Sequence, residues 1–204
     1  EKDRRAGSIL SSLCTAAGDR LSLIEADALE SPIWEFGSAP RRIIANLPYN
    51  IATTLLIRWL AHAAAFESMT LMFQREVAER ITARPGDAAY SRLSVLTGYY
   101  ADAEILFDVP AEAFVPAPKI ISSVVQIVPL AQPRFDCSAQ ALELITRTAF
   151  GQRRKMLRSS LKKINGEQLL AAAGIDPEAR PQQLDIESFC KLARQFEAVG
   201  TAAS

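Results

Sequence analysis

Four consecutive residues, Asn46, Leu47, Pro48 and Tyr49, combine groups that suit the methylation of an amine on a nucleobase. That amine is a poor nucleophile because its lone pair is delocalised into the ring, so a methylating site must accept hydrogen bonds from its N–H groups. The Asn46 side chain offers an acceptor oxygen. The residue before a proline is driven to an extended backbone, which can turn the Leu47 carbonyl toward the same amine. Tyr49 offers a ring on which an extruded base can stack, so the four residues predict a catalytic site; the alternative is an ordinary strand-to-helix turn.

A second ring, Phe114, stands in the proline-rich loop 114–118. Prolines stiffen the backbone, so such a loop holds a large side chain in place at little entropic cost. We expect Phe114 to form another wall of the base site; the alternative is a core phenylalanine packed under the loop. Lys119 follows the loop, and we expect it either to contact phosphate or to be solvated.

A run of basic side chains without any acid extends over residues 147–163 of a chain whose 23 basic and 23 acidic residues balance as a whole. Its members are Arg147, Arg153, Arg154, Lys155, Arg158, Lys162 and Lys163. The pattern predicts a helix over residues 152–164 that carries Arg154, Arg158 and Lys162 or Lys163 on one face. Such a stripe is typical of a surface that binds a phosphate backbone, although a solvated basic face is the alternative. The zero net charge itself excludes a uniformly basic, histone-like protein.

The elements that must position these residues alternate between strand and helix in the first 130 residues. We expect strands at residues 21–25, 42–45, 69–73, 105–109 and 123–128. We expect helices at 4–17, from Thr53 or Thr54 to about 63, at 76–83 and at 91–100. This alternation predicts an α/β domain with a mostly parallel sheet, whose last two strands form an antiparallel hairpin at the edge.

Beyond residue 130 the pattern becomes helical. We expect helices over residues 139–150, 152–164, 167–173 and 186–199, the last with Asp185 as its N-cap. The sequence therefore predicts two domains, an α/β domain over residues 1–130 and a small all-helical domain over residues 131–204.

The remaining reactive residues exclude other kinds of site. Cys14, Cys137 and Cys190 lie far apart, which argues against a disulfide framework or a zinc cluster and favours reduced thiols in the cytoplasm. His62 is the single histidine and has no partner in a nucleophile motif. No apolar run approaches the roughly 20 residues that a membrane span requires. We therefore expect no metal and no membrane association.

Taken together, the motifs resemble the ribosomal RNA adenine-N6 dimethyltransferases, and within them the group that acts on bacterial small-subunit (16S) rRNA. The stretches that carry the resemblance, from Glu1 to about Phe196, are Glu1-Lys2-Asp3, Glu25-Ala26-Asp27-Ala28, Asn46-Leu47-Pro48-Tyr49-Asn50-Ile51, Phe73-Gln74-Arg75-Glu76-Val77, Tyr90-Ser91-Arg92-Leu93-Ser94-Val95, Phe114-Val115-Pro116-Ala117-Pro118-Lys119 and Ala149-Phe150-Gly151-Gln152-Arg153-Arg154-Lys155.

The resemblance implies a Rossmann-like class I methyltransferase fold that uses S-adenosylmethionine and no metal. By this resemblance Glu1 binds the ribose hydroxyls of the donor, Asp27 its adenine amine, and Ala28 contributes a backbone N–H. Asn46 faces both the donor and the target amine, and Tyr49 and Phe114 enclose the target adenine. The family's glycine-rich donor-binding loop is expected upstream of Glu1, so the chain is interpreted as an interior part of a longer protein that binds the donor weakly or not at all without that loop.

The resemblance also implies a substrate. It points to dimethylation of two adjacent adenines in a hairpin near the 3′ end of small-subunit rRNA, within a 30S-type precursor particle, by a cytoplasmic monomer whose helical domain binds RNA. Two alternatives stay open: an antibiotic-resistance methyltransferase acting on large-subunit rRNA, and a non-catalytic RNA-binding assembly factor. A DNA adenine methyltransferase fits less well, because Leu47 departs from the Pro usual in that motif.

Overall fold

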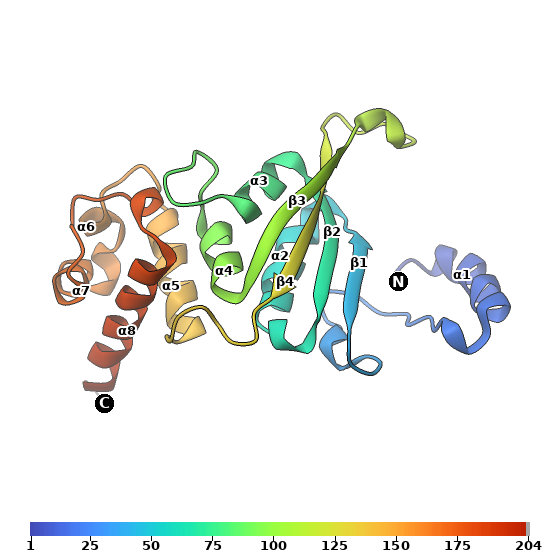
Figure 1. Cartoon of the computed structure of the whole chain (residues 1–204), viewed down its shortest axis with the longest axis horizontal. Coiled ribbons are helices and arrows are strands. Elements are labelled where there is room, and N and C mark those ends of the chain that lie inside the picture. The colour runs from blue at the N-terminus through green and yellow to red at the C-terminus, as the bar shows by residue number, and fades with distance from the viewer. Residues whose placement is uncertain (203–204) are drawn as a thin grey trace.

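The computed structural model describes residues 1–202, and its centre is a four-stranded sheet (Figure 1). The strands are β1 (Arg42–Asn46), β2 (Ser68–Gln74), β3 (Ala101–Val109) and β4 (Ser122–Pro129), in the order β1-β2-β4-β3. The predicted antiparallel hairpin of the last two strands at the sheet edge is confirmed. The expectation of a mostly parallel sheet is wrong for these four strands: only β1 and β2, which are joined by a crossover helix, pair in parallel, and β4 pairs antiparallel with both its neighbours.

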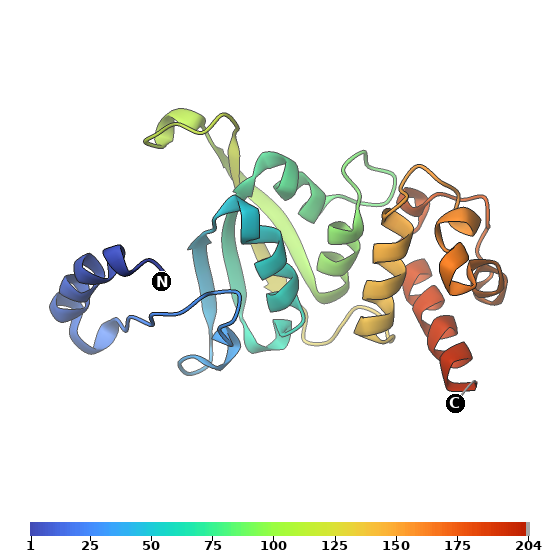
Figure 2. The ribbon, with the colours of Figure 1, turned by 180° about the vertical axis from the view of Figure 1, so that it is seen from behind.

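Three helices, α2 (Tyr49–Leu60), α3 (Arg75–Thr82) and α4 (Arg92–Tyr100), pack against one face of the sheet, as the view from behind shows (Figure 2). The period-2 pattern of β2 turns Met69, Leu71 and Phe73 toward these helices, and all three are fully buried. Helix α2 begins at Tyr49, four residues before the predicted Thr53. The Pro48 carbonyl already accepts the backbone N–H groups of residues 51 and 52, and a proline is well placed just before a helix.

The N-terminal segment lies beyond the β1 edge of the sheet (Figures 1 and 2). Helix α1 (Arg4–Ala17) forms as predicted and ends at Gly18, whose φ of 59° suits glycine and whose N–H donates to the Cys14 carbonyl. The predicted strand over residues 21–25 is wrong. The Leu21 N–H bonds locally to the Gly18 carbonyl, and Glu1 donates to the Ile24 carbonyl and accepts from the Ala26 N–H; a strand needs a longer ladder than this.

The C-terminal part consists of α5 (Ala139–Phe150), α6 (Leu157–Ser160), α7 (Gly166–Ala173) and α8 (Ile186–Ala202). The predicted N-cap of α8 is confirmed, since Asp185 accepts the Ser188 N–H at 2.8 Å. The predicted helix over residues 152–164 is wrong: it is divided into turns, the short α6 and a 3₁₀ turn, Lys162–Ile164. The N–H groups of Leu157 and Arg158 bond to the carbonyls of Ala179 and Pro177, so the chain leaves the helical path to pair with another loop.

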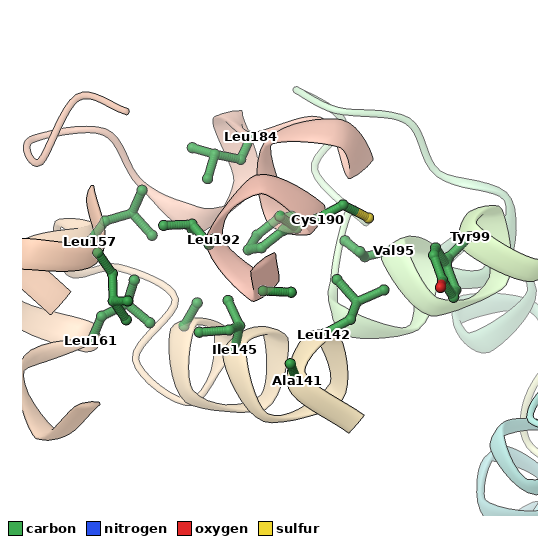
Figure 3. Packing of buried hydrophobic residues seen from close by; sticks show 14 of the residues in the cluster. Val95, Tyr99, Ala141, Leu142, Ile145, Leu157, Leu161, Leu184, Cys190 and Leu192 are labelled. Carbon is green, nitrogen blue, oxygen red and sulfur yellow. The ribbon is translucent and has the colours of Figure 1, made fainter. Parts of the chain in front are cut away.

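Helix α4 joins the two halves of the molecule. Its Leu93 lies in the sheet core, whereas Val95, Leu96 and Tyr99 lie in the core of the C-terminal helices. Figure 3 shows Val95 of α4 between Leu142 of α5 and Cys190 of α8, with Tyr99 further along α4. The division at residue 130 stays a prediction, because a helix of the first part supplies core residues to the second.

Candidate active site

The Asn46–Tyr49 motif lies where three strands end and one begins. Asn46 is the last residue of β1 and Tyr49 the first of α2. In register, Ser122 at the start of β4 pairs with Gln74 at the end of β2 and with Val109 at the end of β3. The loop that carries Phe114 connects β3 to β4 and therefore leaves and returns at this same edge. Ligands of open α/β sheets bind at this kind of edge.

A cavity of about 360 Å³ at this edge contains all four side chains of the motif and the proline-rich loop. Its walls are Asn46, Leu47, Pro48, Tyr49, Phe114, Pro116 and Pro118. The structure thus brings together every residue that the sequence assigned to catalysis. Asn46 is exposed, while Leu47 is buried and also belongs to the sheet core. The lining is apolar apart from the Asn46 amide, the Tyr49 hydroxyl and the backbone, which suits a flat base with one polar edge.

The Tyr49 ring is held by a hydrogen bond that the sequence did not predict. Its hydroxyl lies 2.6 Å from the hydroxyl of Ser122, a fully buried residue. Because the ring is fixed at both its backbone and its hydroxyl end, its face is held at a set orientation in the cavity. The signal that could have found Ser122 is a pair of polar residues, Ser122-Ser123, at the start of a mostly apolar strand.

A second polar chain secures the base of the loop. The Ser123 hydroxyl donates to Asp108 at 2.6 Å, and Asp108 also forms an ion pair of 2.7 Å with Arg75. The backbone N–H of Arg75 in turn bonds to the Ile121 carbonyl at 3.0 Å. These contacts tie both ends of the loop 110–121 to the start of α3, so the position of Phe114 is set from outside the cavity.

The acids assigned to the donor lie in a separate cavity. A space of about 280 Å³ beside α1 is lined by Glu1, Lys2, Asp3, Gly7, Leu23, Glu25, Ala26, Asp27 and Glu30. It brings Glu1 and Asp27 together, as expected for two groups that bind one molecule. Ala28 follows Asp27 but is not part of the lining, and Asn46 lines only the other cavity. The structure therefore divides the predicted donor residues between two cavities.

Both carboxylates are held in their charged form. Asp27 accepts from the Lys2 ammonium at 2.6 Å and from the Leu29 N–H at 2.9 Å, and the hydrogen bond from Lys2 is the main cause of its lowered pKa. Glu1 accepts the backbone N–H groups of Asp3 and Lys2, which lower its pKa as well. Ionised carboxylates are acceptors only, which is the chemistry that a ribose diol and an adenine amine require. These two residues therefore fit the nucleoside half of S-adenosylmethionine. Among residues 1–202 no group of three His, Cys, Asp or Glu side chains is placed to hold a metal.

The segment that follows Asp27 is fastened to α2 by an aromatic stack. Arg58 donates to the carbonyls of Leu29 and Glu30, and its guanidinium lies 5.2 Å from the centre of the Trp34 ring. On Trp34 the His62 ring stacks with 3.7 Å between centroids and 8° between planes. The only histidine thus has a packing role here, in agreement with its exclusion as a catalytic base.

The seven basic residues of segment 147–163 are all exposed, but they do not form the predicted stripe. Arg154 lies in the turn after α5, Arg158 in α6 and Lys162 in the 3₁₀ turn, so no single helix aligns them. Arg158 is also paired with Glu178 at 3.5 Å. Lys119 is exposed at the end of the loop that borders the base cavity. The expectation of one helical face is wrong, whereas contact of these residues with RNA stays a prediction.

Comparison with known structures supports the fold. A dimethyladenosine transferase from Plasmodium falciparum superimposes with a TM-score of 0.78 and 24% identity, over 98% of this chain and 81% of that chain. The 23S rRNA methyltransferase ErmE gives a TM-score of 0.64 and 23% identity, over 97% and 80% of the two chains. At these identities the likeness shows the fold alone, and it confirms the α/β class. No helix within residues 1–202 is long and apolar enough to cross a membrane.

Comparison of sequences shows the family. A chain from Rhodospirillum rubrum named ribosomal RNA small subunit methyltransferase A is 50% identical over 98% of this chain and 70% of its own length. The protein of the same name from Bartonella tribocorum is 55% identical over 95% and 72%. The family described as ribosomal RNA adenine dimethylase matches residues 1–198. The chain, with its amide and two rings at the strand ends, therefore belongs to the ribosomal RNA adenine dimethylase family.

Proposed function

We propose that the protein methylates the N6 amines of two adjacent adenines in a hairpin near the 3′ end of small-subunit rRNA, twice each, and so takes part in the biogenesis of the small ribosomal subunit. The observation that carries this proposal is the cavity in which Asn46 meets the rings of Tyr49 and Phe114. Relatives of about 50% identity named for the small subunit favour that rRNA over the large-subunit alternative.

The residues of the cavity have distinct tasks in this proposal. The Asn46 side-chain oxygen and the Leu47 carbonyl accept the two N–H groups of the target amine, which draws its lone pair out of conjugation with the ring. Tyr49 and Phe114 stack on the base, and each such contact contributes about 1–3 kcal/mol toward the cost of extruding it from the RNA. The described residues that line the cavity include no acidic residue, histidine or lysine that could accept a proton. The proton of the amine therefore leaves to water.

Donor binding is assigned to the other cavity. When bound, S-adenosylmethionine supplies a methyl group that is already activated by its positive sulfur, so the chain contributes mainly position and electrostatics. We assign the ribose hydroxyls to Glu1 and the adenine amine to Asp27, with Ala28 as a backbone donor and Asn46 at the boundary with the substrate. In this structure the Lys2 ammonium donates a hydrogen bond to the Asp27 carboxylate. We propose that the adenine amine of S-adenosylmethionine replaces Lys2 there when it binds.

The RNA surface is proposed to combine Lys119 with Arg147, Arg153, Arg154, Lys155, Arg158, Lys162 and Lys163. Phosphate contacts position an RNA without choosing the base, so we assign the choice of adenine to the cavity and the choice of hairpin to the shape of the RNA. A 30S-type precursor particle as substrate, action as a monomer and a cytoplasmic location complete the proposal.

The decisive experiment compares two asparagines. Asn46→Ala removes the amine acceptor, and loss of one transition-state hydrogen bond of this kind lowers the rate by roughly 10²–10³. Asn50→Ala is the matched control, because Asn50 is exposed on the first turn of α2 and does not line the cavity. The measurement is transfer of tritiated methyl from S-adenosylmethionine to small-subunit particles that lack the modification.

We expect Asn46→Ala to lose transfer while particle binding stays within twofold of the parent chain, and Asn50→Ala to keep both. Near-parental transfer by Asn46→Ala would overturn the catalytic assignment. Particle binding with no transfer, in a chain shown to bind S-adenosylmethionine, would instead support the non-catalytic assembly factor.

A further inference from the structure

A third cavity lies where the sheet helices meet the C-terminal helices, and of the residues that line it only Arg153 has a role in the function proposed above. It encloses about 340 Å³. Its lining is contributed by α2, α3, α4, the end of α5 and the turn that follows: Thr53, Ile57, Val77, Arg80, Ser91, Arg92, Leu93, Phe150 and Arg153.

The floor and the rim of this cavity differ in chemistry. Ile57, Val77, Leu93 and Phe150 supply an apolar floor, and Phe150 presents an aromatic ring to it. Three arginines supply the charged part beside the hydroxyls of Thr53 and Ser91, and of the described residues that line the cavity none is acidic. An apolar slot with guanidinium groups at its border fits a molecule that has a flat apolar part and a phosphate.

The three guanidinium groups are only partly satisfied by the protein. Arg80 pairs with Glu76 one helical turn away, and Arg92 pairs with Glu143 at 2.8 Å through Nη2. The Nε of Arg92 is buried and has no hydrogen-bond partner among the described residues. Arg153 donates to a neutral acceptor, the backbone carbonyl of Ala88. A buried donor without a partner is costly, so an acceptor from a ligand would be favoured here.

The position of the cavity relates it to the target-base site. Tyr49, Thr53 and Ile57 are four residues apart on α2, so they share one face of that helix. Tyr49 lines the target cavity, and Thr53 and Ile57 line the third one. At 1.5 Å per residue, Thr53 lies about 6 Å along the helix axis from Tyr49. The two cavities therefore follow one another along the same helix face, close enough for successive parts of one strand.

We propose that the third cavity binds a nucleotide that neighbours the target adenine in the RNA, with its base on the apolar floor and its phosphate on Arg80, Arg92 and Arg153. The proposal rests on the proposed function for the identity of the strand. Because the substrate contains two adjacent adenines, adenine is the base to test. The site would hold the strand in register while its neighbour is methylated.

The first test measures occupancy without methyl transfer. Backbone amide shifts are followed by NMR while 5′-AMP is added to the full chain. We expect saturable shifts at Thr53, Ser91 and Leu93, about tenfold weaker binding in the double variant Arg80→Gln/Arg153→Gln, and unchanged binding in Arg84→Gln. Arg84 is a suitable control because it is exposed, carries the same charge and does not line this cavity. Shifts confined to residues of the target cavity, or an equal effect of Arg84→Gln, would overturn the proposal.

A second variant separates the base from the phosphate. Thr53→Met narrows the apolar slot without changing charge, and methionine is favourable in a helix. We expect it to weaken 5′-AMP binding about tenfold and to leave the response to inorganic phosphate unchanged. Equal 5′-AMP binding by Thr53→Met and the parent would show that no base enters the slot.

Methyl transfer then distinguishes this proposal from the one on which it rests. In Arg80→Gln/Arg153→Gln we expect a raised KM for small-subunit particles and an unchanged kcat. Transfer by the parent chain without any 5′-AMP response in the third cavity would reject the neighbour site and leave the methyltransferase function intact. Saturable 5′-AMP binding there, in a chain that binds S-adenosylmethionine but transfers no methyl groups, would retain the nucleotide site and reject the function.

Discussion

The hydroxyl pair of Tyr49 and Ser122 shows how single atoms define the base site. The two oxygens are 2.6 Å apart, and Ser122 has no exposed surface. One hydroxyl therefore has to donate and the other to accept, and the buried Ser122 hydroxyl has no access to bulk water as a substitute. The contact links the Tyr49 ring, which lines the cavity, to the first residue of β4.

We predict that Tyr49→Phe destabilises the fold more than its small change in volume suggests. It leaves the Ser122 hydroxyl buried without a partner, which costs about 1–3 kcal/mol in the free energy of unfolding. The double variant Tyr49→Phe/Ser122→Ala removes both groups and should regain much of that loss. Urea denaturation of the parent, both single variants and the double variant measures this coupling, and strictly additive effects would contradict it.

The thiols of Cys137 and Cys190 also differ at the residue scale. Cys190, buried in α8, donates to the Cys137 sulfur and so lowers the pKa of Cys137, and the Arg194 charge acts in the same direction. This contact and burial raise the pKa of the Cys190 thiol. A lower pKa leaves more of the reactive thiolate at a given pH.

We predict that iodoacetamide alkylates Cys137 well before Cys190 at pH 8, as peptide mass spectrometry would measure. In Cys190→Ala the donor is lost, so the pKa of Cys137 should rise and its alkylation rate at the same pH should fall. Equal rates at the two cysteines of the parent chain would show that the pair does not interact in this way.

At the scale of elements, the structure explains which expectations from the sequence hold. Helix α4 and strand β2 are set by local patterns, a capping serine in one and strict alternation in the other, and both appear close to their predicted bounds. The segment 152–164 had a helical pattern, but its N–H groups bond to the loop around Ala179, a distant partner that no local pattern reveals. Likewise residues 21–25 have a strand pattern without a neighbouring strand to complete it.

The division of segment 152–164 changes what we expect of its charges. Arg158 is partly neutralised by Glu178, whereas Arg154 lies in an exposed turn. We predict that Arg154→Gln makes the slope of log K against log salt for particle binding shallower by up to about 0.9, and that Arg158→Gln has a smaller effect. Glu178→Gln is the informative control, because it frees Arg158 and should strengthen binding. Binding isotherms between 50 and 200 mM salt, roughly the range in which such contacts are measured, would test this order. A larger effect of Arg158→Gln than of Arg154→Gln would contradict it.

Two glycines, Gly166 at the start of α7 and Gly98 within α4, should respond differently to the same substitution. A Cβ on Gly166 would lie 2.5 Å from the Leu161 Cβ and 2.8 Å from its backbone carbon, so we predict that Gly166→Ala destabilises by about 1–3 kcal/mol. A Cβ on Gly98 would meet only the end of the flexible Ile186 side chain, at 2.5 Å. Gly98→Ala also gains helix propensity of up to about 1 kcal/mol, so it should be near neutral. Thermal unfolding of the two variants decides the comparison, and a larger loss for Gly98→Ala would contradict it.

For the whole molecule, the sequence predicted the α/β class and the residues that meet at the strand ends, because a motif at a strand end and a loop between the last two strands must share one edge. It could not predict how cavities divide residues that are far apart in the chain. Asn46 and Asp27 were expected in one site and line different cavities, since the segment that carries Asp27 is fastened to α2 by Trp34 and Arg58 instead of pairing with the sheet.

The distribution of aromatic residues between the two cores has a practical consequence. Both tryptophans of the chain, Trp34 and Trp59, belong to the sheet core. In the described part of the helical core the aromatic residues are all tyrosine or phenylalanine. Tryptophan emission therefore reports the sheet half, while far-ultraviolet ellipticity is dominated by helices from both halves. Identical melting curves from the two signals would mean that α4 makes the halves unfold as one unit. If the ellipticity begins to change at a lower temperature than the tryptophan emission, the helical half unfolds while the sheet half is still folded.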